Sequence, residues 1–393
     1  MSSGEQARPV VSTAFGQSAD SRIKGLDGLR ALSMTFVFLQ HRSTLGAAMG
    51  LGCGLVLFFI VSGYLITGIL LRRRAVIEDR ASTTKSELIR FFVARAFRIY
   101  PAYYALLLIA TIFTIAVHPI VYLEWLPVFA TFTTNLVVEY GPKQWPPLGH
   151  VWSLAVEEQF YFVAAPLFLL ISLRRAKYVA LGFVACAAIV ATLLLRAQAG
   201  WVALYVDPFV NFGVLALGSL MAIRCKPADG ERSLPALVGM IGMLACSRAG
   251  IALHRHSADD LTVTALRIGV TFFAAATIWG TIVHQKSVAV RLLSWAPLNF
   301  LGAISYAFYL WHEPIDLDFL RPVFESLGAS AGVASAFVVT LDYAAVAAIA
   351  AISWQLLETP MLRWRDRLIA REPWNRPRQT SAGEGAEALT PAE

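Results

Sequence analysis

The feature that most constrains this chain is a series of long apolar segments that covers most of its 393 residues. A helix that spans a membrane needs about 20 mostly apolar residues. Ten segments come close to this length or exceed it: 28–45, 50–71, 100–118, 151–172, 177–197, 203–223, 234–253, 261–283, 296–314 and 331–357. Only 15% of the residues are charged, whereas a soluble protein carries about 25%. The sequence therefore predicts an all-α, polytopic transmembrane helical bundle with about ten spanning helices, and it disfavours a soluble enzyme.

The charges of the loops predict how the bundle is oriented. Cytoplasmic loops of membrane proteins carry an excess of Lys and Arg. The connection after the second segment holds eight such residues: Arg72, Arg73, Arg74, Arg80, Lys85, Arg90, Arg95 and Arg98. Counting from there brings the basic clusters at 174–177, 224–232, 286–291 and 363–367 to the same side, provided that the shorter segment 122–138 does not span. We therefore expect both termini in the cytoplasm and 122–138 as a re-entrant or interfacial piece on the outer side.

The two ends of the chain differ from its centre in composition. Residues 1–21 and 370–393 are polar and predict disordered tails on either side of a membrane domain at 22–369. Residues 1–21 also lack the apolar run of a secretory signal. Much of the net charge of +7 lies in the loop clusters, so it does not indicate binding of nucleic acid. The four cysteines are isolated in the sequence and indicate neither a disulfide framework nor a zinc site.

The first candidate helix contains Asp27 and the pair of Arg30 and His41. Ionisable groups at membrane depth are costly and mark function. Eleven residues of helix place the two side chains about 20° apart on one face and about 16 Å apart along the axis. Arg30 is then near the cytoplasmic side and His41 near the outer side. The alternative is that Arg30 extends to the inner interface and His41 only ends the helix, but the common face favours a function.

A second polar stripe begins the segment 151–172. His150 and Glu157 are seven residues apart, hence about 20° apart on one face, and Tyr161 follows Glu157 by one turn. Such a stripe can hold and orient a proton acceptor. The alternative is an aromatic belt at the outer interface, with Trp152, Tyr161 and Phe162 as anchors. A belt does not explain the adjacent carboxylates of Glu157 and Glu158.

A third histidine, His312, ends the segment 296–314. In the predicted topology His41, His150 and His312 all lie at the outer end, which predicts a polar chamber there. Metal binding is the competing chemical use of such histidines. No pair of histidines at i, i+4 and no tight ligand cluster supports it, and we expect no metal.

On the cytoplasmic side, Arg95 and Arg98 precede Pro101, which is expected to start the next helix. Two arginines three residues apart are helix neighbours and can form a two-pronged clamp for a phosphate group. The alternative is that they only set the topology, as most such clusters do.

These segments resemble, in order, the motifs of the integral-membrane acyltransferase family 3, over about residues 26–362. Arg30 of GLDGLRAL, followed after ten residues by His41, is similar to the family's arginine–histidine signature. The other motifs are GLGCGLVLFFIVSGYLIT, RFFVARAFRIYP, HVWSLAVEEQFYF, ISYAFYLWHEP and the closing LETP. The resemblance implies a bacterial inner (plasma) membrane enzyme that modifies hydroxyl groups of sugars or related compounds with acetyl or larger acyl groups.

The resemblance also implies roles for the candidate residues. Acyl-CoA, usually acetyl-CoA, is the implied donor, with its phosphates at Arg95 and Arg98 and its thioester guided by Arg30. His41 is expected to act as a general base on an acceptor hydroxyl or to be transiently acylated. Glu157 is expected to orient or tune an imidazole. The residues expected to contact substrate or shape its chamber are His150, Trp152, Tyr161 and His312.

The chain departs from many family members after its last apolar segment. Those members add a serine-hydrolase-type domain, whereas only about thirty residues follow Pro360 here. Acceptor specificity is therefore expected from the membrane domain or from a partner. Beside membrane lipids, a second copy of the chain and proteins of glycan assembly are candidate partners.

Two other functional classes stay open. A transporter of a glycan precursor or small anion predicts the same spans and buried charges. A catalytically inactive scaffold in an envelope-assembly complex is the third class, and the intact pair of Arg30 and His41 disfavours it. The acyl length and the acceptor are also open; candidate acceptors are an exopolysaccharide, a lipopolysaccharide O-antigen, a periplasmic glucan, a nodulation-type oligosaccharide and a glycosylated antibiotic.

Overall fold

The computed structural model describes residues 23–117, 123–140, 148–255 and 260–371. Within these residues the regular structure is helical, and the β-type contacts are limited to an isolated bridge between Asp229 and His284. The predicted all-α fold is confirmed. The predicted tail 1–21 lies outside the described residues. So does the predicted tail 370–393, except for its first two residues, which belong to the last helix.

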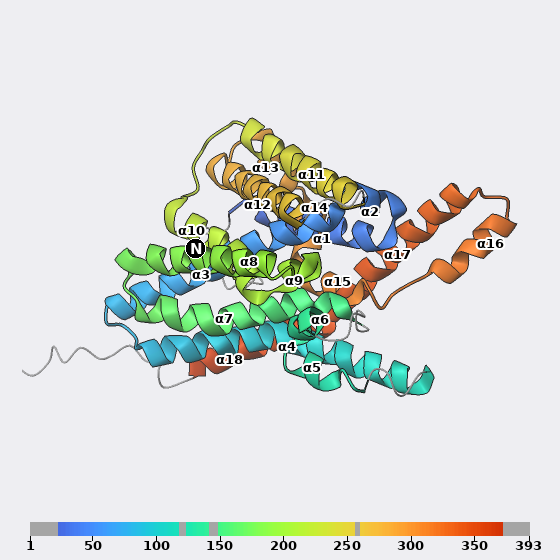
Figure 1. The fold of residues 1–393 in the computed structure, drawn as a ribbon. Helices are drawn as coiled ribbons and strands as arrows, with labels where there is room; N and C mark the ends of the chain where they lie inside the picture. Colours follow the sequence, from blue (N-terminus) through green and yellow to red (C-terminus); the bar gives the residue numbers. More distant parts are fainter. Residues whose placement is uncertain (1–22, 118–122, 141–147, 256–259, 372–393) are drawn as a thin grey trace, which may run out of the picture.

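The structure is a bundle of long helices, most of which run in roughly the same direction in Figure 1. They are α1 (Leu26–Arg42), α3 (Gly54–Glu78), α4 (Thr84–Val117), α7 (Trp152–Leu170), α8 (Ala176–Arg196), α10 (Pro208–Arg224), α11 (Leu234–Arg255), α12 (Asp260–Val283) and α17 (Ala331–Ser353). Shorter helices connect or cap them: α2 (Thr44–Met49), α5 (Leu126–Ala130), α6 (Thr134–Tyr140), α9 (Gly200–Val206), α13 (Val288–Leu293), α14 (Ala296–Ala303), α15 (Ser305–Trp311), α16 (Arg321–Ser326) and α18 (Thr359–Arg371). Tight 3-10 turns are η2 (Leu51–Cys53), η3 (Gly149–Val151), η4 (Leu173–Arg175) and η5 (Asp318–Leu320), and η6 (Trp354–Glu358) is a π-helical turn.

The chain is an integral membrane protein. Seven helices of the described residues are long and apolar enough to cross a membrane, and α9 with α10, bent by 44°, make an eighth if they count as one span. Two further segments that we predicted to span are short or broken. Helix α1 has 17 residues, which rise about 26 Å against a hydrocarbon core of about 30 Å. The segment 296–314 is divided at Ile304 into α14 and α15.

Helix α4 is longer than predicted at its N-terminal end. It begins at Thr84, where the preceding Thr83 hydroxyl accepts a hydrogen bond from a first-turn backbone amide. Pro101 therefore lies inside the helix, and the prediction that Pro101 starts it is wrong. A proline removes one backbone donor and normally breaks a helix. Before the proline, however, the Phe91 ring packs on Tyr161 of α7, and after it the Tyr103 hydroxyl donates to the Phe129 carbonyl of α5. Arg95 and Arg98 consequently lie on a helix and not in a loop.

The doubtful segment 122–138 forms two short helices, α5 and α6, that meet near Phe132, whose φ is +53°. Neither has the length to cross a membrane. The Tyr103 hydroxyl of α4 donates to the Phe129 carbonyl at 2.8 Å, and the Gln159 amide of α7 donates to the Phe132 carbonyl at 2.8 Å. The segment is thus held against α4 and α7, and its place on the outer side stays a prediction.

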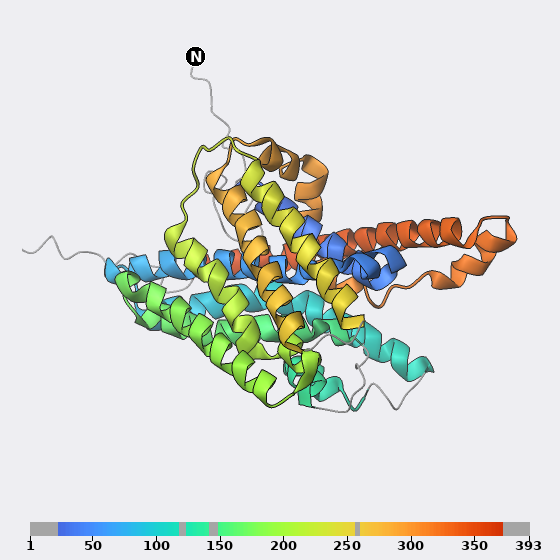
Figure 2. The same cartoon turned by 45° about the horizontal axis from the view of Figure 1, so that its top comes forward.

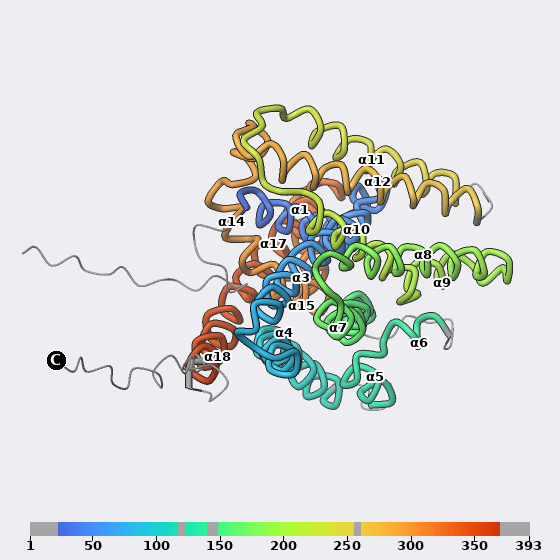
Figure 3. The backbone as a smooth tube through the Cα atoms, turned by 90° about the vertical axis from the view of Figure 1, so that its left-hand side faces the viewer, coloured from blue at the N-terminus to red at the C-terminus, as the bar shows by residue number. Residues whose placement is uncertain are grey.

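Close contact between α3 and α10 forms the centre of the bundle (Figure 3). A Cβ atom added at Gly63 of α3 would lie 1.9 Å from the Leu215 carbonyl oxygen, and one added at Gly218 of α10 would lie 2.0 Å from the Ile60 carbonyl oxygen. In a membrane the hydrophobic effect does not drive helices together, because lipid tails are as apolar as the helices. Helices associate there by close packing, which small residues allow. The α11–α12 hairpin lies across the bundle beside this centre (Figure 2).

The loops that we predicted on the cytoplasmic side lie together, at the left of Figure 1. The carboxylate of Glu78, the last residue of α3, accepts hydrogen bonds from Arg74 and from the backbone amide of Leu173 in η4. Lys286 after α12 pairs with Asp229 before α11 at 2.8 Å. We call this the basic end of the bundle, and the opposite end, which carries His41 and the residues that contact it, the histidine end.

Candidate active site

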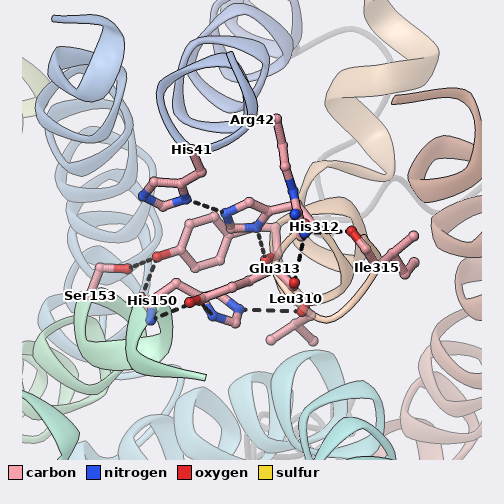
Figure 4. A network of polar contacts seen from close by, with 9 residues as sticks. His41, Arg42, His150, Ser153, Leu310, His312, Glu313 and Ile315 are labelled. Atoms are coloured by element: carbon pink, nitrogen blue, oxygen red, sulfur yellow. Dashed lines mark hydrogen bonds and ion pairs between the residues drawn. The ribbon is translucent and has the colours of Figure 1, made fainter. Parts of the chain in front are cut away.

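Three histidines that are far apart in sequence meet at the histidine end (Figure 4). His41 is the penultimate residue of α1, His150 is the central residue of η3 just before α7, and His312 follows α15 directly. The ring centroids of His41 and His312 are 5.2 Å apart, and those of His150 and His312 are 4.9 Å apart. The structure thus brings together the three histidines that the predicted topology placed at one end.

The hydrogen bonds of His312 determine which nitrogen of His41 carries a proton. Nδ1 of His312 lies 2.6 Å from the carbonyl oxygen of Tyr309, and a carbonyl only accepts, so this nitrogen is the donor. In a neutral imidazole the other nitrogen, Nε2, is then an acceptor. Nδ1 of His41, 3.0 Å from it, must donate. This assignment leaves Nε2 of His41 as an unprotonated base.

Glu313 is a functional candidate that the sequence analysis missed. Its carboxylate forms an ion pair with Nδ1 of His150 and accepts a hydrogen bond from the His150 backbone amide at 3.1 Å. Burial acts to raise the pKa of Glu313, but the charge of His150 and its hydrogen bonds outweigh this and lower the pKa to about 2. The carboxylate beside His150 is therefore Glu313, and its place directly after His312 in LWHEP was the available signal.

Arg42, also missed, ties the end of α1 to the loop that follows α15. Its guanidinium donates to the backbone carbonyls of His312, at 3.0 Å, and of Glu313, at 2.7 Å, and also to the carbonyl of Ile315. The same group pairs with the Asp316 carboxylate at 2.6 Å. One side chain therefore fixes the backbone that carries His312 and Glu313.

Three buried arginines form a second cluster, closer to the basic end. Arg30, Arg95 and Arg98 line a small pocket of about 40 Å³ together with Glu157 and Tyr161. The Tyr161 hydroxyl donates to the Glu157 carboxylate at 3.2 Å. Glu157 and Tyr161 thus lie with the arginines, whereas the sequence analysis grouped them with His150. The two clusters contain the two members of the predicted pair, Arg30 in one and His41 in the other.

Arg98 also makes a buried ion pair. Its guanidinium lies 3.2 Å from the carboxylate of Glu358, and its Cζ lies 4.8 Å from the ring centroid of Trp354. Glu358 ends the π-helical turn η6, an irregularity that is frequent at functional sites. Both charges are almost fully buried, so each depends on the other for compensation.

The remaining predicted residue, Trp152, lies at the histidine end. It is the first residue of α7 and lines a large cavity that also includes His41, His150 and Glu313. Among the residues that the structure describes, no group of three or more His, Cys, Asp or Glu side chains is arranged to hold a metal ion.

Known proteins give an independent comparison. A family model described as an acyltransferase domain matches residues 23–353. The O-acetyltransferase OatA of Staphylococcus aureus is 27% identical over 365 residues, which cover 86% of this chain and 57% of the relative. The peptidoglycan O-acetyltransferase OatA of Listeria monocytogenes is 28% identical over 368 residues, with 86% and 56% covered.

A third relative, the putative peptidoglycan O-acetyltransferase YrhL of Bacillus subtilis, is 27% identical over 325 residues, with 75% of this chain and 48% of the relative covered. The chain therefore spans about half the length of the curated relatives that it matches. No solved structure gives a significant match.

Proposed function

The chain belongs to the family of the acyltransferase domain that matches residues 23–353, and from this premise we propose that it is a membrane O-acyltransferase. It moves an acyl group, usually acetyl, from acyl-CoA to a hydroxyl group of a sugar or glycan. The hydrogen-bonded chain from Tyr309 through His312 to His41 is the observation that carries this proposal, because it holds one imidazole ready as a base.

Acyl transfer needs little more than such a base. A thioester is already activated, and only the acceptor hydroxyl must lose its proton. Nε2 of His41 takes this proton while the hydroxyl oxygen attacks the thioester carbonyl carbon. The new C–O bond forms, the C–S bond breaks, and the proton passes from His41 to the departing sulfur of CoA. His312 is a positioning residue in this scheme, since it fixes the orientation and tautomer of His41.

The rest of the histidine end supports the base. His150 is held by Glu313 through its ring and its backbone amide. Arg42 fixes the backbone on which His312 and Glu313 lie. Trp152 and His150 line the cavity beside His41 and are proposed to contact the acceptor.

The arginine cluster is proposed to receive the donor from the basic end. Arg30, Arg95 and Arg98 supply three positive charges to an anionic substrate. Their pocket of about 40 Å³ holds little more than water, so the donor must displace side chains to enter. The carboxylate of Glu358 already pairs with Arg98 and is proposed to give way to a donor phosphate. Glu157 and Tyr161 line the same pocket and are therefore proposed to act at the donor site.

The acceptor is proposed to be a glycan of the cell envelope. Two of the relatives carry the name peptidoglycan O-acetyltransferase, one of them as putative, which favours a peptidoglycan sugar. We place the chain in the bacterial plasma membrane, with the basic end and both termini in the cytoplasm, because the clustered loop charges follow the positive-inside rule. The histidine end then faces the outer side, where an envelope glycan is found.

Labelled acetyl-CoA tests this function. Membranes that contain the protein are incubated with acetyl-CoA labelled in the acetyl group and with soluble peptidoglycan glycan strands. We expect label in an alkali-labile ester on the sugar, and no such label with membranes that lack the protein. Movement of an unmodified glycan or anion across the membrane without ester formation would instead identify a transporter.

A further inference from the structure

A large cavity lies beside His41 and is much bigger than an acetyl group requires. Its volume is about 610 Å³, within the range of about 300–1,000 Å³ that is typical of sites for small organic ligands. His41, which is exposed, and His150 form one side of it. Helices α9, α11 and α12 form the other side. The cavity therefore has room for a second molecule next to the proposed base.

A row of four aromatic rings follows the wall of this cavity. The ring centroids of Trp152 and Tyr205 are 4.9 Å apart, those of Tyr205 and Trp201 are 6.1 Å apart, and those of Trp201 and His254 are 5.8 Å apart. All four rings line the cavity. The row leads from the start of α7, beside His150, across α9 to the end of α11.

The middle of the row is held rigidly. Arg267 of α12 donates hydrogen bonds to the backbone carbonyls of Leu204 and Tyr205 and to the side-chain oxygen of Asn211. Its Cζ lies 5.3 Å from the ring centroid of Tyr205, a cation–π distance. The ring of Tyr205 is thus fixed before any ligand arrives, which lowers the cost of binding.

Polar groups face the same cavity as the rings. Gln40, Ser247 and Glu313 line it together with His41, and the side chain of Glu313 is 41% exposed. Aliphatic side chains such as Val56, Ile251 and Leu266 also line the cavity, but an acyl chain would leave the polar groups without a partner. Aromatic faces beside hydrogen-bonding groups match a pyranose ring, because its C–H faces are apolar and its hydroxyls are donors and acceptors.

We propose that this cavity is the acceptor subsite, in which sugar rings of a glycan stack on Trp201 and Tyr205 while a hydroxyl reaches His41. The proposal rests on the proposed function and deepens it by assigning residues of α9, α11 and α12 to acceptor recognition. The donor enters from the opposite side, through the arginine cluster, so the two substrates meet at His41.

A cavity-filling variant tests the proposal. A Cβ atom added at Gly250 of α11 meets no atom closer than the Cβ of Leu266, at 3.8 Å, so the side chain of Gly250→Leu enters the cavity without a backbone clash. Gly182→Leu on α8 is the matched control, since a Cβ atom there meets nothing within 4 Å and Gly182 does not line the cavity. Trp201→Ala and Trp201→Phe, at a residue that is 42% exposed, test the aromatic row separately.

The assay uses the full-length protein, acetyl-CoA and soluble oligosaccharides from peptidoglycan glycan strands. We expect the KM for the oligosaccharide to rise at least tenfold in Gly250→Leu and Trp201→Ala, and less in Trp201→Phe. The KM for acetyl-CoA should stay within twofold of that of the wild-type protein. Gly182→Leu should match the wild-type protein in both constants.

Three outcomes overturn the proposal. An unchanged KM for the oligosaccharide in both Gly250→Leu and Trp201→Ala, with active wild-type protein, rejects the subsite alone and leaves the proposed function intact. Loss of transfer from hexanoyl-CoA but not from acetyl-CoA in Gly250→Leu makes the cavity an acyl-chain pocket. Absence of ester formation with the wild-type protein overturns the proposed function, and the subsite with it.

Discussion

His41 and His312 are 271 residues apart in the chain, yet Nδ1 of the first lies 3.0 Å from Nε2 of the second. Their rings are nearly parallel, with an interplanar angle of 10°. His312 is almost fully buried, at 1% exposure, and His41 borders the large cavity. The buried imidazole of His312 thus holds the more accessible imidazole of His41 in a single tautomer. The carboxylate of a serine-hydrolase triad fixes the tautomer of its histidine in the same way.

Loss of His312 should reduce turnover more than substrate binding. His312→Ala removes the acceptor that fixes the tautomer of His41, and we expect kcat to fall by about 10- to 100-fold, since a fully working general base contributes about 10²–10⁴. The KM for acetyl-CoA should change little. His312→Gln keeps a side-chain acceptor near the position of Nε2, so it should recover part of kcat. Equal kcat values for the two variants would contradict a positioning role.

Arg42 should be needed for turnover although it is not proposed to touch substrate. Arg42→Leu removes the donors to the carbonyls of His312 and Glu313 and frees the loop after α15. We expect kcat to fall by about tenfold, because small misplacements of catalytic groups are costly. Asp316→Asn is the matched control: it removes only the charge partner of Arg42, and kcat should fall less than in Arg42→Leu. The comparison is made by initial rates at saturating substrates.

The pair of Glu313 and His150 should make stability depend on acidic pH. The pKa of Glu313 is lowered from 4.5 to about 2 in the folded protein. A lowered pKa stabilises the fold at pH values above about 4.5, and this contribution is lost as the pH falls through about 2. Thermal unfolding in detergent should therefore show a Tm that falls between these pH values. In Glu313→Gln the fall should be smaller, and an identical pH dependence in both proteins would contradict the pairing.

Two variants separate the structural role of Arg98 from its proposed role in donor binding. Arg98→Ala leaves the carboxylate of Glu358 buried without its partner, which costs about 3–5 kcal/mol in comparable pairs. The double variant Arg98→Leu with Glu358→Leu removes both charges and should recover most of the decrease in Tm that Arg98→Ala causes. The KM for acetyl-CoA should stay raised in the double variant, whereas the KM for the acceptor should not. Recovery of donor KM together with Tm would show that Arg98 only stabilises the fold.

Much of the fold was predictable from the sequence because a membrane imposes a length on every apolar helix. The segments at 177–197, 234–253 and 261–283 appear as α8, α11 and α12 with small shifts at their ends. The errors lie where a local rule competes with packing. Pro101 should end a helix by its own chemistry, but α4 continues through it, with α7 packed on Phe91 before the proline and α5 bonded to Tyr103 after it. The break at Ile304 was not predicted. Residue 304 is neither proline nor glycine, and Gly302 lies inside α14.

The candidate site was predictable only in part. Helix periodicity and loop charge brought His41, His150 and His312 to one end, and the structure places them in contact. Periodicity also paired His150 with Glu157, because both were assumed to lie on one regular helix. His150 instead lies in the turn η3 before α7, which directs it to Glu313 on another segment. The aromatic row depends on contacts among α7, α9 and α11, and no pattern within one segment encodes such contacts.

The most direct test is the rate of ester formation by His41→Ala. Purified wild-type protein and His41→Ala are compared with acetyl-CoA and glycan strands at saturating concentrations, and Tm confirms that both are folded. Loss of the proposed general base predicts a fall in kcat of at least about 100-fold with Tm within a few degrees of the wild-type value. A kcat within threefold of the wild-type value would contradict the assignment of His41 as the base.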